Sequence, residues 1–326
     1  MFIGTIMNYW HNEFVIGKDL SVPRFISGPL DGYTDSPFRQ LVRQYSPRAL
    51  LYSEMRHVAS VSHDLGAEKA LKYKKEERPV NFQVSANSTD FVEEALERIV
   101  AAGFNSVDLN IGCPARAVVN SGAGSELMSE IDKLEEMIKL FRKHLSIPLT
   151  TKIRAGFKET NALEVAKMLC DNGVDAIAIH PRLQSAKFSG EPDYDLVAEV
   201  KQAISVPLII SGGINTIEDA KMVYERTGVD GFLIGRGMQG QPWKLKQLEM
   251  EAVGETFTIS RKEILACAQQ HLQLLVEHYG DHGLYCFRKH IPFYIHDFEE
   301  ASAIRKELMT MESYALLQES FKQLTM

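Results

Sequence analysis

One cysteine in the chain has the type and setting expected of a residue that handles protons. Cys113 stands between Gly112 and Pro114, so it occupies a turn, whereas the other three cysteines lie in segments that read as helices. A thiol of ordinary acidity is mostly protonated at neutral pH and can therefore donate a proton as well as act as a nucleophile. We therefore predict that Cys113 is the catalytic residue.

A lysine and two polar partners suggest that a flavin works beside it. Lys152 ends an apolar run, where burying its charge is costly unless an anionic or electron-rich partner compensates. A flavin is such a partner, because a lysine beside its N1/O2 edge stabilises the negative charge of the reduced ring. Gln83 and His180 could hydrogen-bond the ring or the ribityl chain. Considered alone, His180 is equally explained as a structural histidine at the end of a strand.

Two glycine-rich turns are suited to a phosphate group. Ser211–Gly213 and Gly235–Gly237 each follow an apolar run, and glycine allows backbone N–H groups to approach an anion closely. Arg236 adds a charged donor. Either turn alone is equally explained as a tight connection, but the two together favour a phosphate site.

These residues follow apolar runs that alternate with amphipathic segments, a pattern that predicts a parallel sheet made of βα units. Because there are eight such runs, we predict a closed (β/α)8 barrel, an α/β fold whose active site lies at the C-terminal ends of the strands. The predicted strands are 24–27, 50–53, 80–84, 106–110, 149–153, 176–179, 208–211 and 231–234, with amphipathic helices such as 89–102 and 161–172 between them.

The chain divides into three parts. Residues 1–22 show weak periodicity and are predicted to be an extension, loosely structured and without an assigned function. Residues 23–255 form the predicted barrel, and residues 256–326 a helical domain, with a linker near residues 253–258. The connection after the fourth strand is longer than the others and holds the small-residue stretch 120–125, which predicts a functional loop beside Cys113.

Composition restricts the class of protein. The formal charge is -7, so binding to nucleic acid through bulk positive charge is excluded and any such contact must be local. The chain has no apolar run of membrane-spanning length, no signal peptide and no CxxC pair or zinc spacing, which predicts a cytoplasmic protein without a membrane partner or metal site. Nothing in the sequence implies a protein partner.

Taken together, the motifs resemble those of the tRNA-dihydrouridine synthases, FMN-dependent enzymes that reduce a uracil base in tRNA with NADPH. The resemblance covers roughly residues 25–295, and Asn-x-Gly-Cys-Pro with the later Arg-Lys-His is its most specific combination. It is carried by residues 28–39, 53–55, 108–114, 152–157, 179–182, 234–237 and 288–290.

The resemblance implies a role for each matching residue. FMN would be held by Pro29, Leu30, Asp31, Gln83, Lys152, His180, Ser211, Gly212, Gly213, Gly235 and Arg236. Hydride would pass from the reduced flavin to uracil C6 while Cys113 protonates C5. The RNA substrate would be bound by Asn110, Arg154, Arg182, Arg288, Lys289 and His290, with Lys152 helping to orient the pyrimidine and the helical domain gripping the backbone of a tRNA whose target base is extruded.

Some features depart from the family pattern or leave alternatives open. Pro181 and Leu183 replace a glycine and a threonine, and Ser211 replaces an asparagine. Pro181 therefore lacks a backbone donor and Leu183 lacks a hydroxyl that the family pattern has near the flavin. The helical domain carries seven lysines and arginines against nine acids from residue 260 onward, which makes it no basic clamp overall. An FMN enzyme acting on a free pyrimidine, and a non-catalytic tRNA-binding protein, therefore remain as alternatives.

Overall fold

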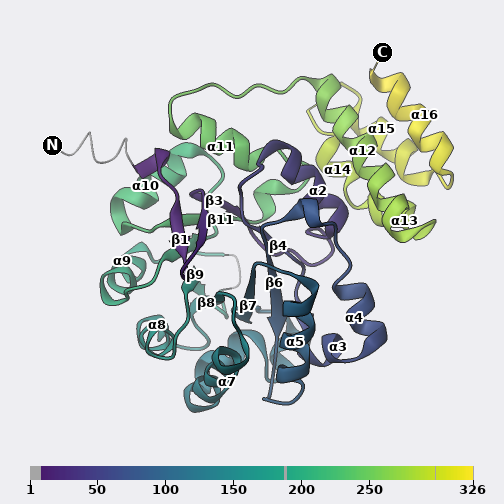
Figure 1. Cartoon of the computed structure of the whole chain (residues 1–326). Coiled ribbons are helices and arrows are strands. Elements are labelled where there is room, and N and C mark those ends of the chain that lie inside the picture. The colour runs from purple at the N-terminus through teal and green to yellow at the C-terminus, as the bar shows by residue number, and fades with distance from the viewer. Residues whose placement is uncertain (1–8, 187–188, 298, 326) are drawn as a thin grey trace.

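Parallel strands form a nearly closed barrel at the centre of the computed structural model, which describes residues 9–186, 189–297 and 299–325 (Figure 1). Along the sheet the order is β3-β11-β10-β9-β8-β7-β6-β4, and Ser27 N donates to Leu50 O at 3.0 Å between the two ends. The (β/α)8 barrel predicted from the sequence is therefore confirmed. Its strands are β3 (Phe25–Ser27), β4 (Leu51–Tyr52), β6 (Val80–Ser85), β7 (Ser106–Ile111), β8 (Leu149–Gly156), β9 (Ala176–Leu183), β10 (Leu208–Ser211) and β11 (Gly231–Ile234), with the short β5 (Arg56–His57) also paired to β6.

Side chains alternate between the two faces of these strands, as the pleat requires. On β6, Val80, Phe82 and Val84 face outward and pack with the helices in the larger core, whereas Asn81 and Gln83 belong to the polar interior. The same alternation on β7 and β8 directs Asp108, Asn110, Thr150 and Lys152 inward. A polar layer thus lies under the barrel mouth on the β6 to β8 side.

Amphipathic helices surround the barrel and bury apolar side chains against the strands, apart from the short α6 (Arg116–Asn120), which has no buried residue. The predicted helix 89–102 begins only at Val92, because Phe91 adopts a left-handed backbone conformation with φ of 62°. The surrounding helices are α2 (Ser36–Tyr45), α3 (Val58–Ser62), α4 (Asp64–Ala70), α5 (Val92–Ala102), α6 (Arg116–Asn120), α7 (Ile131–His144), α8 (Ala162–Asp171), α9 (Tyr194–Ala203), α10 (Ile217–Thr227) and α11 (Lys244–Ala252), with 3-10 turns η1 (Lys75–Glu77), η2 (Gly124–Ser129) and η3 (Arg236–Met238).

A repeated side-chain cap closes the N-terminal ends of neighbouring strands. Asp175, just before β9, accepts a hydrogen bond at 2.8 Å from the N–H of Leu149, the first residue of β8. Asp230 does the same for Leu208 at the start of β10, and Asn105 for Val80 at the start of β6. These caps satisfy backbone donors that have no strand partner, so they fix strand ends opposite to the mouth.

Residues 14–22 differ from the loose extension that the sequence predicts. They form an antiparallel hairpin of β1 (Phe14–Ile16) and β2 (Leu20–Val22), and its Phe14, Ile16 and Val22 are buried with interior barrel residues in a small separate core. The hairpin therefore covers the apolar end of the barrel. Its strands have three residues each, too few to give a periodic signal, and residues 1–8 lie outside the described part of the chain.

The helical segment after residue 260 packs on the barrel rather than standing apart. It consists of α12 (Arg261–Tyr279), α13 (His282–Arg288), α14 (Ile291–Tyr294), α15 (Ala301–Thr310) and α16 (Tyr314–Thr325), and its core also takes in Leu41 of α2 and Trp243 before α11. Residues 253–260, between α11 and α12, form no helix or strand. No helix in the described ranges is both long and apolar enough to span a membrane.

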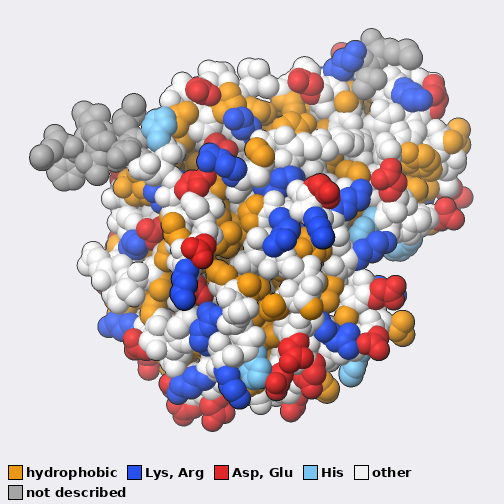
Figure 2. All heavy atoms as spheres, in the orientation of Figure 1, with side chains coloured by type: hydrophobic (Ala, Val, Ile, Leu, Met, Phe, Trp, Pro, Cys, Tyr) orange, Lys and Arg blue, Asp and Glu red, His pale blue; other side chains and the backbone are white. Residues whose placement is uncertain are grey.

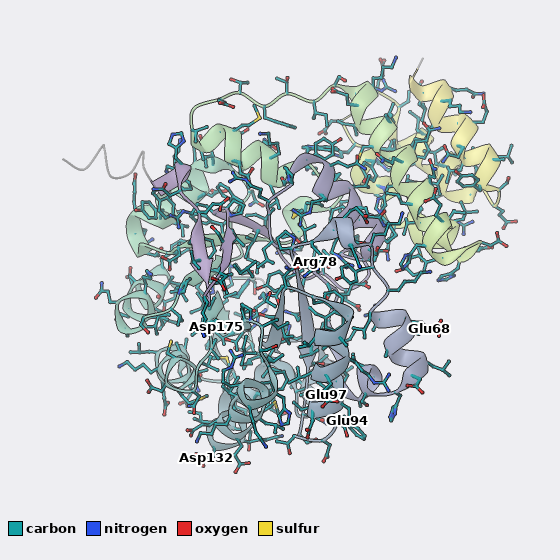
Figure 3. The ribbon with its side chains drawn as sticks, viewed as in Figure 1. Glu68, Arg78, Glu94, Glu97, Asp132 and Asp175 are labelled. Carbon is teal, nitrogen blue, oxygen red and sulfur yellow. The ribbon has the colours of Figure 1, made fainter. Side chains whose placement is uncertain are left out.

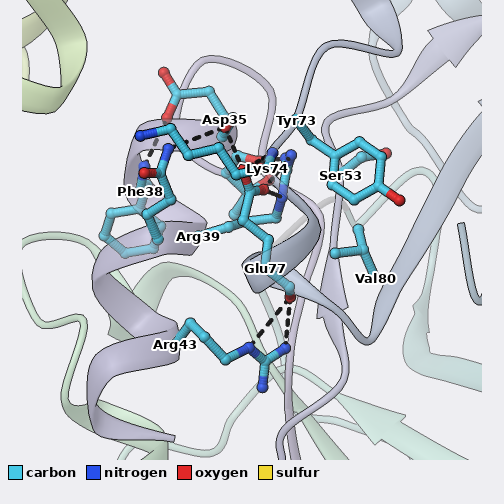
Figure 4. A network of polar contacts seen from close by, with 12 residues as sticks. Asp35, Phe38, Arg39, Arg43, Ser53, Tyr73, Lys74, Glu77 and Val80 are labelled. Atoms are coloured by element: carbon cyan, nitrogen blue, oxygen red, sulfur yellow. Dashed lines mark hydrogen bonds and ion pairs between the residues drawn. The ribbon is translucent and has the colours of Figure 1, made fainter. Parts of the chain in front are cut away.

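A buried ion pair anchors the loop that follows β3. Arg39 of α2 donates from Nε to Glu77 at 2.8 Å and from Nη1 to the carbonyl of Thr34 at 2.7 Å, and Glu77 also accepts a hydrogen bond from Ser36 (Figure 4). Arg43, one turn along α2, donates to the Glu77 carbonyl. Since Glu77 is fully buried, this network fixes the loop at the barrel mouth that carries Pro29, Leu30 and Asp31.

The excess of acid lies partly on the outer helices. Glu68 of α4, Glu94 and Glu97 of α5, and Asp132 of α7 are exposed at the perimeter of the barrel (Figure 3). Acidic and basic side chains alternate over the face shown in Figure 2 and form no single-sign region there. On this face the acidic side chains are therefore interspersed with basic ones.

Candidate active site

A cavity of about 420 Å³ opens at the C-terminal ends of the barrel strands. Four cationic side chains and one carboxylate are among its described lining residues, so the cavity is suited to an anionic ligand. It contains Cys113 and all of the residues predicted to hold the cofactor, and also Asn110, Arg154 and Arg182. The remaining lining residues are Gly28, Met55, Gly112, Pro114, Ile214, Asn215, Leu233 and Gly237.

The backbone N–H and the backbone carbonyl of Cys113 both form hydrogen bonds that fix its turn. Asn110 Oδ1 accepts hydrogen bonds from Gly112 N at 3.1 Å and from Cys113 N at 2.8 Å. On the other side the Cys113 carbonyl accepts from Ser125 Oγ at 2.9 Å and from Ser125 N at 3.2 Å. The half-buried thiol is therefore presented to the cavity by a fixed backbone, as a proton donor in catalysis requires.

Arg154 supports the same turn from β8. Its Nε donates to the carbonyl of Gly112 at 2.9 Å and its Nη1 to the carbonyl of Leu183 at 3.0 Å, while only 2% of the residue is exposed. The guanidinium thus joins the Cys113 turn to the end of β9. The Arg154 side chain contributes positive charge to the cavity, and two of its N–H groups donate to backbone carbonyls. Its contact with the substrate remains a prediction.

Lys152 and His180 lie beside one another in the cationic wall of the cavity. Burial, followed by the positive charge of Arg154, lowers the pKa of Lys152 to about 8. Burial, with Lys152 and three arginines adding to it, lowers the pKa of His180 to about 2. At neutral pH the lysine is therefore mostly charged and the histidine neutral, so that His180 can accept a hydrogen bond as well as donate one.

Glycine is required where the backbone lines the cavity after β10. Gly212 and Gly213 have φ values of 93° and 80°, in the left-handed region that other residues rarely adopt. A Cβ at Gly212 would lie 2.7 Å from Nε2 of His180, a contact too short to be tolerated without movement. The two glycines therefore keep the backbone open toward the cavity, which fits the sequence prediction of a site for an anionic cofactor group.

Replacing Gly212 by alanine is expected to weaken flavin binding about tenfold, because the new methyl group must displace His180 and strain the turn. Fluorescence titration of the apoprotein with FMN measures the change. Gly228→Ala is the matched control, since Gly228 also has a positive φ, of 66°, but nothing lies within 4 Å of its Cβ position. Equal affinity in the two variants would show that the close approach at His180 has no role in binding.

The Arg-Lys-His segment of the helical module lies near the mouth but outside the cavity lining. Lys289 Nζ lies 5.4 Å from the centre of the Tyr33 ring, in the loop after β3, whereas His290 is fully buried against His271 and Tyr33. Arg288 donates to the carbonyl of Met311 at 3.1 Å and stacks over Tyr285. Lys289 and His290 both contact Tyr33 of the loop after β3, and of these two only Lys289 is partly exposed. The substrate roles of all three residues remain predictions.

Two residues that support the site were not predicted from the sequence. Ser125 bonds the Cys113 carbonyl, and Asp108 bonds Gln83 and Thr150 beneath the cavity. The small-residue stretch 120–125 indicated a functional loop without indicating which of its residues turns back to the cysteine. Two of the three positions that depart from the family pattern make backbone contacts, since the Leu183 carbonyl accepts from Arg154 Nη1 and the Pro181 carbonyl from Asp193 N.

Comparison with known proteins identifies one family across nearly the whole chain. A model described as "Dihydrouridine synthase (Dus)" matches residues 25–324. The chain is 35% identical over 310 residues to "Probable tRNA-dihydrouridine synthase 1" of Synechocystis sp., an alignment that covers 93% of this chain and 87% of the other. It is 31% identical over 300 residues to "tRNA-dihydrouridine synthase B" of Vibrio vulnificus, covering 90% and 93% respectively.

Solved structures confirm the barrel at much lower sequence identity. The old yellow enzyme homologue from Zymomonas mobilis superposes with a TM-score of 0.55 and 13% identity, covering 71% of this chain and 89% of that one. The structure titled TcOYE with pHBA gives 0.58 and 13%, covering 75% and 93%. At this identity the likeness concerns the fold alone.

Proposed function

This chain belongs to the dihydrouridine synthase family, and we propose that it reduces the C5–C6 double bond of a uridine in tRNA, with FMN bound in the barrel and NADPH as the reductant. The observation that carries the proposal is the fixed Cys113 turn at the edge of a cationic cavity. A thiol held there supports the assignment of Cys113 as the proton donor, because the adjoining space is suited to an anionic redox cofactor.

The charge of the cavity and the glycine turns at its edge support FMN as the cofactor. Lys152, Arg154, Arg182 and Arg236 oppose a single carboxylate, Asp31, among the described lining residues, which suits both a phosphate and the anionic form of a reduced ring. The turns at Gly212–Gly213 and Gly235 bring backbone close to the cavity after β10 and β11, where barrels of this type commonly bind phosphate. We assign Gln83, Lys152 and His180 to the ring and ribityl side.

The protein's own contribution to the reaction is then proton donation and alignment. FMN, when bound and reduced, supplies the hydride that reaches C6 of the uracil. Cys113 Sγ gives its proton to C5, so that hydride and proton together saturate the double bond and leave a thiolate that must be reprotonated before the next turnover. Asn110, Ser125 and Arg154 keep the thiol in position through the backbone of its turn.

A tRNA substrate requires a surface beyond the cavity, because the target base must leave its stack to reach Cys113. The helical module packs beside the mouth through Leu41 and Trp243, and Lys289 faces the loop after β3. This placement favours RNA over a free pyrimidine, since a small molecule would need no module there. We propose that the module positions the tRNA backbone while the barrel performs the chemistry.

The proposal is tested with the purified full-length protein, FMN, NADPH and an unmodified tRNA transcript. The expected product is a tRNA that has gained two hydrogens at one uridine, located by mass spectrometry of nuclease fragments. Free uridine serves as the competing substrate. Turnover of free uridine at the rate seen with tRNA would favour the small-molecule alternative, whereas a colourless protein that binds tRNA but no flavin would favour the non-catalytic one.

A further inference from the structure

A line of hydrogen bonds joins a buried carboxylate in the barrel interior to the backbone of Cys113. Gln83 Nε2 donates to Asp108 Oδ2 at 2.8 Å, and Gln83 Oε1 accepts from Asn110 Nδ2 at 3.0 Å. Asn110 Oδ1 in turn accepts from the N–H groups of Gly112 and Cys113. The parallel pairing of β6 with β7 produces this line, because it sets Gln83 directly beside Asp108.

The two ends of the line determine the direction of every bond within it. An ionised carboxylate can only accept hydrogen bonds, and backbone N–H groups can only donate them. Gln83 must therefore turn its NH2 group toward Asp108, and Asn110 must turn its carbonyl oxygen toward Cys113. If either amide were reversed, two donors or two acceptors would face each other inside a buried site.

The burial of the line makes this direction matter. Asp108 is fully buried, Gln83 is 1% exposed and Asn110 is 6% exposed, so a lost hydrogen-bond partner leaves a buried polar group that is costly to leave unsatisfied. Burial raises the pKa of Asp108 to about 6, while hydrogen bonds from Thr150 and Gln83 and the charge of Lys152 hold it lower than burial alone would. The carboxylate is therefore mostly ionised at neutral pH.

We propose that Asp108 is a positioning residue of the reaction, which sets the orientation of Gln83 and Asn110 and through them holds the Cys113 turn in its proton-donating geometry. The inference rests on the proposed role of Cys113. Asp108 itself does not line the cavity, so it acts on the Cys113 turn through the two amides, while its charge also raises the pKa of Lys152.

Exchanging the carboxylate and the amide at positions 108 and 110 tests the direction of these hydrogen bonds. Asp108→Asn removes the obligate acceptor, and Asn110→Asp places a second carboxylate at the other side of Gln83. In the double variant Gln83 can turn around, accept from the new asparagine and donate to the new aspartate, whose other oxygen still accepts from the Cys113 turn. We expect each single variant to lower the melting temperature by about 3 °C or more and the double variant to regain most of the loss of Asn110→Asp.

Dihydrouridine formation provides the second readout. Each single variant is expected to slow the reduction of uridine by enzyme that already carries reduced FMN about tenfold, and the double variant should exceed Asn110→Asp in this half-reaction. The control is Asn81→Ala, which removes another buried amide of the same polar layer, one bonded to Thr150 and not to Gln83. It should lower the melting temperature without slowing uridine reduction.

The outcomes separate this inference from the proposed function. Strictly additive losses of melting temperature in the double variant would overturn the directed line, and coupled stability with unchanged uridine reduction in all variants would overturn its positioning role. A wild-type enzyme that forms no dihydrouridine in tRNA would instead contradict the proposed function, and an active Cys113→Ala enzyme would contradict the proposed role of Cys113, while the coupling in melting temperature would still report on the line itself.

Discussion

Replacing Cys113 by alanine is expected to lower dihydrouridine formation by about 10²- to 10⁴-fold, the range that a positioned acid contributes to a rate. The variant should bind FMN and be reduced by NADPH at nearly the wild-type rate, because the thiol is one residue at the edge of a cavity whose other wall holds the cationic groups. Stopped-flow spectroscopy separates the two half-reactions by following flavin reduction and its reoxidation by tRNA.

The structure explains why this loss should fall on one half-reaction. Asn110 and Ser125 bond only to the backbone of Cys113, so an alanine side chain leaves the turn and its hydrogen bonds in place. What disappears is the single proton donor. Cys113→Ser should recover little activity, since a hydroxyl is a far weaker acid than a thiol.

Cys170→Ala is the matched control for the cysteine variant. Cys170 is also half-buried, but it lies on α8 and packs against the outer core, away from the cavity. It should reduce uridine at the wild-type rate. If Cys113→Ala did the same, the thiol would have no part in the chemistry and another proton donor would have to be found.

The barrel and the residues at its mouth could be predicted from the sequence because parallel strands buried on both sides appear as contiguous apolar runs. The polar residue that follows each run then falls at the C-terminal end of a strand, which is how Gln83, Lys152 and His180 were brought into one site. Both steps use information that is local in the chain.

The supports of the site could not be predicted in this way, because they depend on register between strands and on loops that fold back. Asp108 bonds Gln83 from a neighbouring strand, and Ser125 reaches Cys113 across twelve positions of a long loop. The hairpin of residues 14–22 was missed for a different reason, since its apolar residues belong to the interior of the barrel and follow no pattern of their own.

The sequence pattern was also insufficient to predict how the helical module packs on the barrel. Spacing predicted helices after residue 260, but not that their core would include Leu41 and Trp243 of the preceding part. The module and the barrel share apolar surface, and His271 and His290 lie fully buried on the module side. The module that we propose to position the tRNA therefore shares a hydrophobic core with the barrel.

Replacing Lys152 by methionine is expected to slow the reduction of bound FMN by about 100-fold, the loss seen when a fixed electrostatic stabiliser is removed from a developing charge. Methionine keeps the length and apolar contacts of the side chain while removing its ammonium group, which faces the cavity beside Asn110 and His180. Lys152→Arg should retain much of the rate, because the charge persists.

The effect should also depend on pH in a direction that the structure determines. Burial and Arg154 lower the pKa of Lys152 to about 8, so the ammonium is present below that pH and lost above it. The advantage of the wild type over Lys152→Met in flavin reduction should therefore be largest near pH 7 and should shrink as pH rises through about 8.

Lys244→Met provides the comparison, since Lys244 is 8% exposed and burial also lowers its pKa, yet it bonds Gln247 and does not line the cavity. That variant should leave flavin reduction and its pH dependence unchanged. A pH-independent ratio between wild type and Lys152→Met would mean that the ammonium does not stabilise the reduced flavin, and the cationic wall would then have to act through its arginines. A ratio that falls with rising pH would identify Lys152 as the titrating group, because His180 is neutral throughout this range.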